Sequence, residues 1–303
     1  MFLLMACAAC AQERSLVFST HDPAVIERFV ENPAVTGEMV DRLVLAVTGE
    51  KSLKAAWASL VKPEDVVGLM ASNTEGTQLS AHQGIIDAVV RGLKLAGIPS
   101  QNIVITKGIQ SKGDIDHENK IVAPIAGKLI IGDLDFKPGG EEMSTVSHWS
   151  KFVCGRVTKI INLPVLASVE SCGVAGSLYN ATIPHLDNWR RFVAAPGFGD
   201  PYLASLYADD RLRPKIVLTI MDGLVAQYAA GPGFSPNYTF HHATLYAGRD
   251  PVAIDAHAFR LIETWRHESK VPSIAERAAY LRSAQGMGLG NFDVERVQLK
   301  SVQ

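Results

Sequence analysis

Residues 62–108 read KPEDVVGLMASNTEGTQLSAHQGIIDAVVRGLKLAGIPSQNIVITKG, and this stretch decides the fold. A short apolar run at 65–72 predicts a buried strand, and a second run at 101–107 predicts another. Between them, residues 79–98 repeat apolar side chains at helical spacing, with Ser80 as the expected N-cap. A strand, a helix and a strand within about 40 residues form a βαβ unit, so the two strands should be parallel with a right-handed crossover.

The same alternation of strands and helices continues to the end of the chain. Residues 157–163 and 215–221 predict two more buried strands, and we expect both to lie parallel to the first two in one sheet. Helices should cover both faces of this mostly parallel sheet, which is a three-layer α/β fold. The other predicted elements include helices at 19–32, 36–49, 52–61, 250–268 and 273–290, a helix that starts at Asp200 and Pro201, and strands at 127–134 and 243–250.

Composition places the chain among ordinary globular proteins. Its 303 residues are enough for a sizeable core, 47% are hydrophobic, 20% are charged, and the formal net charge is −2. No basic block or stripe occurs, so we expect no nucleic-acid partner. No apolar run reaches the ~20 residues that a transmembrane helix needs.

The N-terminal residues 1–15 resemble a secretory leader. MFLLMACAACAQ combines a short apolar stretch with a candidate A-x-A cleavage site, and Cys7 stands where a lipoprotein signal has its lipidated cysteine. We therefore expect a signal-like leader at 1–15 and a single α/β domain at 16–303. The protein would be exported, as a periplasmic or lipoprotein-anchored protein, if the leader is genuine, and cytoplasmic otherwise. The alternative interpretation makes Cys7 and Cys10 a metal or redox pair.

Two cysteines, Cys154 and Cys172, lie beyond this leader. They can be paired in an exported protein or buried and free, and both alternatives stay open. No set of cysteines and histidines has the spacing of a zinc or iron–sulfur site, so we expect no metal and no cofactor.

Six motifs, in order along the chain, carry a resemblance to a known family. They are KPEDVVGL, LSAHQGIIDAVVRGLKLAGIPSQNIVI, KIINLPVL, GVAGSLYN, IVLTIMDGL followed by GP, and AGRDPVAIDAHA. From about residue 62 to residue 290 the chain therefore resembles domain of unknown function 362. The resemblance implies an α/β fold, often behind an export signal and sometimes fused to an iron–sulfur module, and it implies no settled activity. Because a ferredoxin-type cysteine run is absent here, no cluster is implied.

Four positions depart from the pattern of this family. Relatives read I-K-V-N after the first strand, N-x-P-V-L-K-x-H after the central strand and A-L-K-N downstream, whereas this chain reads LMAS, NLPVLASV and SLYN. The three lysine positions therefore hold Met70, Ala167 and Tyr179, and the histidine position holds Val169. If the protein is an enzyme, its acid or base must then be an aspartate.

The ends of the predicted strands supply the candidate site. Ligand sites in open parallel sheets lie outside the carboxyl ends of the strands. That rule selects Ser72, Asn73, Lys107, Asn162, Asp222 and the loop at Asp250.

Asp222 and Asp255 are the candidate catalytic residues. Asp222 follows a buried strand and precedes Gly223, so a carboxylate at a site edge and an Asp-Gly turn fit this position equally. Asp255 interrupts the apolar run VAIDAHAF, where a buried carboxylate needs either a structural partner or a pocket. The candidate ligand-binding residues are Asn73, Asn162, Asn180 and His82. We expect the two aspartates to share one cavity with Asn162 and Asn180, and the alternative for His82 is a surface or capping role.

Three functional hypotheses follow from these residues. The leading one is an exported α/β protein that binds a small polar ligand at the carboxyl ends of the strands. The first alternative is a catalytically inactive binding or scaffold protein, because the usual ionisable side chains are replaced at the motif positions. The second is a redox or iron–sulfur accessory protein. The substrate, the reaction and the oligomeric state stay open.

Overall fold

The computed structural model describes residues 14–73, 79–122, 146–193 and 197–303. The expected leader thus falls outside the described residues except for Arg14 and Ser15, and the expected strand at 127–134 falls outside them completely. Ser15 is the first residue of a strand, so the folded part begins at or before this position.

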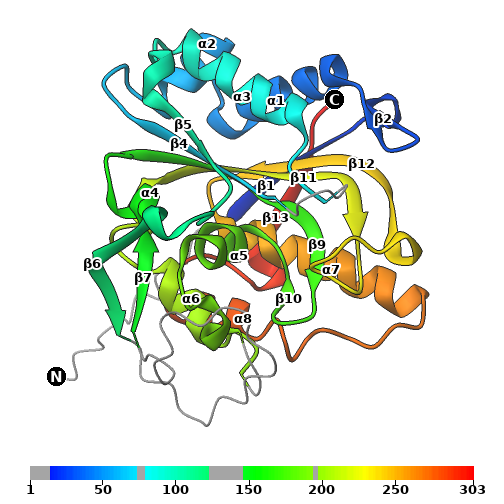
Figure 1. Ribbon diagram of the computed structural model, residues 1–303. Helices are drawn as coiled ribbons and strands as arrows, with labels where there is room; N and C mark the ends of the chain where they lie inside the picture. Colours follow the sequence, from blue (N-terminus) through cyan, green and yellow to red (C-terminus); the bar gives the residue numbers. More distant parts are fainter. Residues whose placement is uncertain (1–13, 74–78, 123–145, 194–196) are drawn as a thin grey trace, which may run out of the picture.

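A mixed, mostly parallel sheet of nine strands forms the centre of the described structure (Figure 1). Its strands, in spatial order, are β13 (Val297–Ser301), β1 (Ser15–His21), β12 (Thr239–Gly248), β11 (Ile216–Gln227), β8 (Lys159–Leu163), β4 (Val67–Ala71) and β5 (Ile103–Thr106). Two more, β9 (Val165–Val169) and β10 (Gly173–Val174), continue the sheet beside β11.

The predicted parallel arrangement is confirmed. Strand β4 pairs parallel with β5 and with β8, and β8 pairs parallel with β11. The predicted strand at 243–250 is β12, and it pairs antiparallel with both of its neighbours, β11 and β1. A helix crosses from β4 to β5, as the βαβ pattern predicts.

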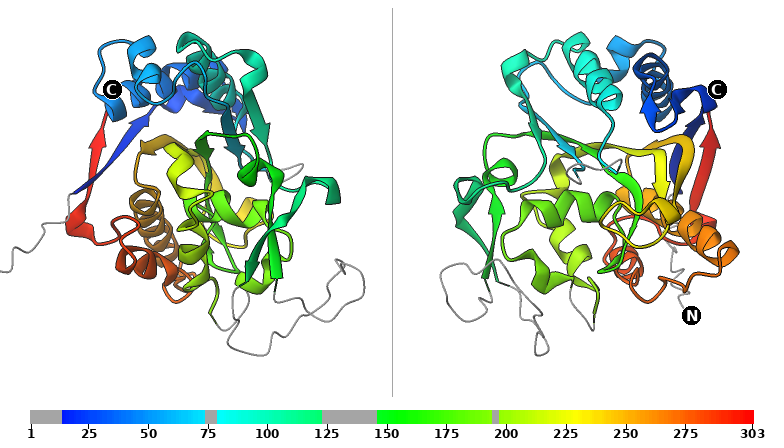
Figure 2. Two further views of the ribbon diagram at one scale, coloured as in Figure 1. Left: turned by 90° about the vertical axis from the view of Figure 1, so that its left-hand side faces the viewer. Right: turned by 45° about the vertical axis from the view of Figure 1, so that its right-hand side comes forward.

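Helices cover both faces of the sheet, so the three-layer prediction is confirmed (Figures 1 and 2). One layer contains α1 (Pro33–Thr48), α2 (Leu53–Ala58) and α3 (Gln83–Leu95), and the other contains α5 (Ser177–Thr182), α6 (Tyr202–Tyr207), α7 (Pro251–Glu268) and α8 (Tyr280–Gly286). Side chains of a strand alternate between the two layers. In β4, for example, Leu69 packs in the core below α1–α3, and Met70 packs in the core beside α5 and α7.

Local chemistry explains where the long helices begin and end. Asp250 is the N-cap of α7 and its side chain accepts a hydrogen bond from the Ala253 amide, with Pro251 as the first helical residue. Gly49 ends α1 in the left-handed region at φ 72°. Helix α3 begins later than predicted, because its N-cap is His82 and not Ser80.

The predicted helix at 19–32 is wrong. These residues contain the end of β1, a single 3-10 turn at Pro23–Val25, and a small hairpin of β2 (Ile26–Glu27) and β3 (Val30–Glu31). The hairpin turn needs left-handed conformations at Arg28 and Phe29, which have φ values of 50° and 62° and which a helical pattern does not reveal.

Two further differences concern the strands near the site. The predicted strand at 157–163 is β8, and a further strand that was not predicted, β9, begins directly after Pro164. Strand β11 is longer than predicted, so Asp222 lies within it and not at its end. The structure also contains a separate hairpin of β6 (Ile115–Val122) and β7 (Val146–Ser150), followed by the short helix α4 (Lys151–Cys154).

Candidate functional site

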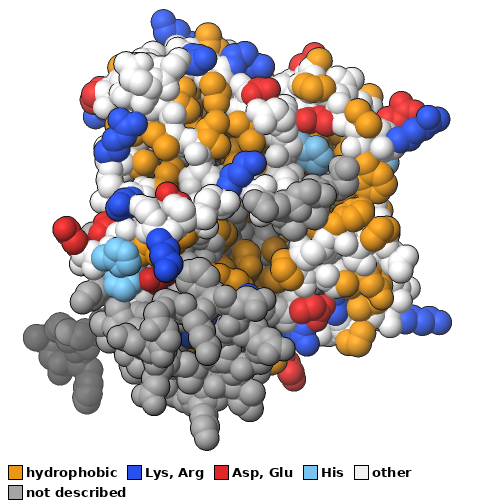
Figure 3. Space-filling view, in the orientation of Figure 1, with side chains coloured by type: hydrophobic (Ala, Val, Ile, Leu, Met, Phe, Trp, Pro, Cys, Tyr) orange, Lys and Arg blue, Asp and Glu red, His pale blue; other side chains and the backbone are white. Residues whose placement is uncertain are grey.

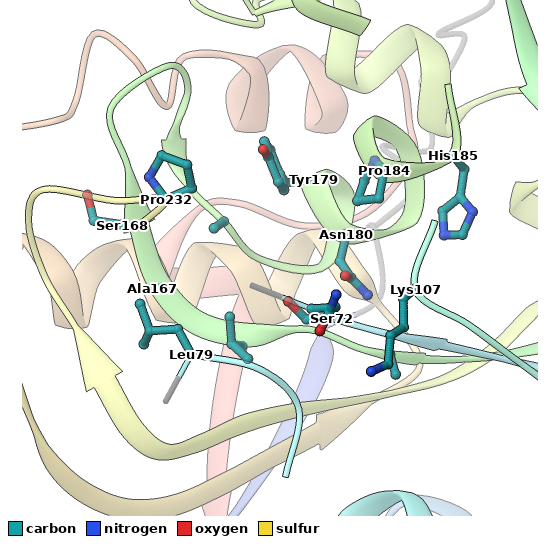
Figure 4. A pocket seen from close by; sticks show the side chains of 14 residues that line it. Ser72, Leu79, Lys107, Ala167, Ser168, Tyr179, Asn180, Pro184, His185 and Pro232 are labelled. Carbon is teal, nitrogen blue, oxygen red and sulfur yellow. The ribbon is translucent and has the colours of Figure 1, made fainter. Parts of the chain in front are cut away.

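A cavity of about 250 Å³ opens at the carboxyl ends of β4 and β5, between them and α5 (Figure 4). This is the edge at which open α/β sheets bind ligands, and the volume suits a small molecule. The residues that line it are Ala71, Ser72, Asn73, Leu79, Lys107, Val165, Ala167, Ser168, Ala175, Tyr179, Asn180, Pro184, His185 and Pro232.

The cavity wall carries one cation and several neutral polar groups. Among the described residues that line the cavity, Lys107 is the only charged one. It directly follows β5 and is exposed to solvent. Elsewhere, on the face shown in Figure 3, positive and negative side chains are interspersed. The positive character of the cavity is therefore local to Lys107.

Asn180 is held in the cavity wall by a buried amide network. Its Nδ2 donates to the backbone oxygen of Met70 at 2.9 Å and to Oδ1 of Asn162 at 2.8 Å. Asn162 is fully buried, and its own Nδ2 donates to the backbone oxygen of Ser177 at 2.9 Å. Because the two backbone oxygens can only accept, the orientation of both amides is determined. Both N–H groups of Asn180 are thus used, and its Oδ1 has no hydrogen-bond partner within the described chain.

His185 contributes a neutral ring to the wall. Burial lowers its pKa to about 3, so the imidazole is uncharged near neutral pH. The ring stacks on Phe152, with 5.5 Å between centroids, and Nδ1 lies 3.4 Å from Oγ of Ser150. The hydroxyl of Ser168 is buried and has no hydrogen-bond partner among the described residues. Neither group carries a charge at neutral pH.

Asp255 binds the N-terminus of α5 from within α7. The carboxylate is fully buried and accepts hydrogen bonds from the amides of Ser177, at 2.5 Å, and Leu178, at 2.9 Å. Burial raises the pKa of Asp255 to about 6, although these amide bonds oppose the change. Gly176 precedes the two amides, and a Cβ there would lie 2.2 Å from the carboxylate, so the contact requires glycine. The partner that this mid-helix aspartate needs is therefore a helix end.

Asp222 makes a similar contact with the N-cap of α3. Its Oδ2 accepts from the backbone amide of His82 at 2.8 Å and lies 2.7 Å from Nδ1 of the same residue, while Oδ1 accepts from the amide of Leu224. Burial alone lowers the pKa of His82, but the charge and hydrogen bond of Asp222, together with the charge of Glu31, raise it to about 9. His82 therefore stays protonated at neutral pH, and its contact with Asp222 joins β11 to α3.

The structure brings some of the predicted site residues together and places others apart from the cavity. Asn73 and Asn180 line it, and Asn162 lies directly behind Asn180. Asp222, His82 and Asp255 do not line this cavity. Asp222 and Asp255 instead accept hydrogen bonds from amides at the starts of α3 and α5, and His82 is the N-cap of α3. The catalytic or ligand-binding roles of these three residues stay predictions.

Sequence reasoning missed several lining residues. The strand-end rule selects Lys107 as a position, but His185 and Ser168 follow no motif that marks them. His185 enters the wall because the 3-10 turn Ile183–His185 follows α5 directly. Tyr179 could have been found, because it occupies one of the positions where relatives have lysine.

The four departures from the family pattern have different surroundings. Ala167 and Tyr179 line the cavity, whereas Met70 and Val169 are buried in the core. Burial raises the pKa of Tyr179, so its phenol stays protonated. Two of the three lysine positions of the pattern therefore face the cavity, and in this chain they carry uncharged side chains.

Both described cysteines are free thiols. Burial raises the pKa of Cys154 to about 11, and it raises that of the fully buried Cys172 further, so neither is a reactive thiolate. Within the described ranges, no group of three or more His, Cys, Asp and Glu side chains is placed to hold a metal ion. No helix in the same ranges is long and apolar enough to cross a membrane.

Comparison with known proteins identifies one family. The profile of the family described as Domain of unknown function (DUF362) matches residues 69–260, which include most of the cavity wall. No curated protein and no solved structure matches the chain.

Proposed function

The chain belongs to the DUF362 family, and we propose from this premise that it binds a small polar ligand in the cavity at the carboxyl ends of β4 and β5. The observation that carries the proposal is the oriented amide of Asn180. A buried side-chain amide lowers the stability of the fold unless its donors and acceptor form hydrogen bonds, because burial removes the water molecules that would otherwise bind them. The Met70 oxygen and Asn162 Oδ1 accept the two N–H groups of Asn180, which leaves its Oδ1 acceptor for a ligand.

Binding fits the wall better than proton transfer does. No carboxylate lines the cavity among the described residues, and the lining histidine is neutral. These observations favour the second candidate as well, a binding member of the family without catalytic activity. If proton transfer does occur, Asp222, which contacts Nδ1 of His82, is our candidate for it.

A ligand screen with a blocked cavity tests the proposal. A chemically broad library of small polar compounds is screened by thermal shift against the wild type and Ala167→Leu, whose larger side chain fills part of the cavity. Ala58→Leu, at the exposed end of α2, is the matched control. We expect compounds that stabilise the wild type and Ala58→Leu but not Ala167→Leu. If no compound shows this dependence, the proposed function is wrong.

A further inference from the structure

We infer that the cavity recognises a small organic anion that carries a hydrogen-bond donor beside its charge, such as a short hydroxycarboxylate or aminocarboxylate. The inference rests on the proposed binding function and names the chemical class of the ligand. Two features of the wall carry it, the oriented acceptor at Asn180 and the cation at Lys107.

The acceptor at Asn180 requires a donor on the ligand. An asparagine in a binding site can normally turn its amide to suit either kind of partner. Here the turn is excluded, because it would place Oδ1 against the Met70 oxygen and against Oδ1 of Asn162. Asn162 cannot turn in compensation, since its Nδ2 is needed by the Ser177 oxygen. A ligand that offers only acceptors would therefore leave Asn180 Oδ1 unsatisfied.

The cation at Lys107 requires an acceptor on the ligand and favours a negative charge. An ammonium group has three donors and no acceptor. No described side chain in the cavity wall carries a negative charge that would neutralise it. A neutral acceptor would bind this ammonium without the additional attraction of an ion pair, and a cationic group would be repelled.

The remaining wall groups are compatible with such a ligand and limit its size. The neutral ring of His185 can donate or accept a hydrogen bond, so it does not select a charge. The apolar side chains of Leu79, Val165 and Ala167 leave room for a short carbon skeleton. The cavity of about 250 Å³ lies just below the usual range for drug-sized ligands, which favours a compact molecule.

Matched ligands separate the two requirements. Binding of lactate, glycerate and alanine is measured by calorimetry, and each is compared with propionate, which lacks the donor, and with lactamide, which lacks the charge. Inorganic phosphate is a separate arm, because its hydrogen phosphate form also combines a charge with a donor. The proteins are the wild type, Lys107→Met, Ala167→Leu and Lys94→Met, an exposed lysine of α3 that serves as the charge control.

We expect at least one hydroxy- or aminocarboxylate to bind the wild type about tenfold or more tightly than both propionate and lactamide. Lys107→Met should remove the preference over lactamide, Ala167→Leu should abolish binding, and Lys94→Met should bind as the wild type does. Phosphate binding that Ala167→Leu also abolishes would support the shared anion chemistry with an inorganic source.

Three results would overturn the inference. One is binding that Ala167→Leu abolishes but in which propionate or lactamide binds as tightly as the hydroxy acid. This result would leave the proposed function intact. Another is binding of these anions that survives Ala167→Leu, since the ion then pairs with Lys107 at the surface only. The third is no binding by any of these anions, and the broad library screen then decides whether the proposed function fails as well.

Discussion

His82 contacts one carboxylate oxygen of Asp222 twice, through its backbone amide at 2.8 Å and through Nδ1 at 2.7 Å. The two residues are 140 positions apart, and the contact fixes the start of α3 against the middle of β11. Both side chains are largely buried, with exposed fractions of 12% and 2%, so solvent screens their attraction only weakly. The pair is therefore a buried contact between α3 and β11, and the strength of this contact depends on pH.

The stability of the protein should fall as the pH rises through the titration range of His82. The folded state raises the pKa of His82 from 6.5 to about 9, so the folded chain holds a proton that the unfolded chain has lost. The contribution is fully present below pH 6.5 and is lost as the pH approaches 9. The shift corresponds to a contribution of roughly 3 kcal/mol. Urea unfolding of the wild type and of His82→Asn between these limits measures it.

The difference between the unfolding free energies of the wild type and His82→Asn gives the contribution of His82, because the other titrating groups are the same in both proteins. The asparagine amide that His82→Asn introduces can still donate near the Nδ1 position, but it carries no charge at any pH. We expect the difference to shrink steadily across the range. Parallel pH profiles for the two proteins would show that the pair is not ionised in the folded state.

Asp255 should stabilise the folded state through the hydrogen bonds that its carboxylate accepts. Asp255→Ala leaves the buried amides of Ser177 and Leu178 without a partner and should cost about 3 kcal/mol. Asp255→Asn keeps one acceptor oxygen and avoids burying a charge, so it should cost only about 1 kcal/mol. Denaturant unfolding of both variants checks this order. Equal losses in the two variants would mean that the charge, and not the acceptor geometry, stabilises α5.

The sequence predicts those parts of the arrangement that depend on local interactions. The four parallel strands and the long helices were predicted, because hydrophobic periodicity and capping residues such as Asp250 act over a few positions. The contacts of Asp222 and Asp255 could not be predicted in the same way. Each joins segments far apart in the sequence, and an aspartate that accepts from a distant helix end has no pattern of its own.

One edge of the sheet, formed by β13 and its neighbour β1, shows the same limitation. Strand β13 has mostly exposed residues and pairs with β1, from the opposite end of the chain, so no local signal marks it. The sequence predicts a leader up to residue 15 and a helix from residue 19, whereas Ser15–His21 form β1 and Val17 is fully buried in the sheet. In the cavity, Asn180 was predicted as a site residue, but the direction of its amide follows only from Met70 and Asn162 in three dimensions.

The side-chain amide of Asn162 should contribute more to the unfolding free energy than an ordinary surface amide does. Asn162→Ala removes the partners of the Ser177 oxygen and of one N–H of Asn180, both of which are buried. We expect a loss of about 2 kcal/mol in unfolding free energy. The control is Asn102→Ala, a partly buried amide that donates at 3.3 Å to the Asp65 oxygen, where the loss should stay below about 0.5 kcal/mol. Similar losses at both positions would contradict the buried network.

Gly92 should be intolerant of the substitution that usually stabilises a helix. It lies in α3 directly over Trp57 of α2, and a Cβ at this position would approach Nε1 of the indole to 2.0 Å. Alanine raises helix propensity by about 1 kcal/mol, but overpacking a buried contact costs ~1–3 kcal/mol, and Trp57 is fully buried with no room to move. We therefore expect Gly92→Ala to lower the unfolding free energy by about 1–2 kcal/mol. Gly286, at the end of α8, has no atom within 4 Å of its Cβ position, so Gly286→Ala should be neutral or slightly stabilising. Chemical denaturation of the two variants gives the comparison, and a stabilised Gly92→Ala would mean that α3 does not pack closely on Trp57.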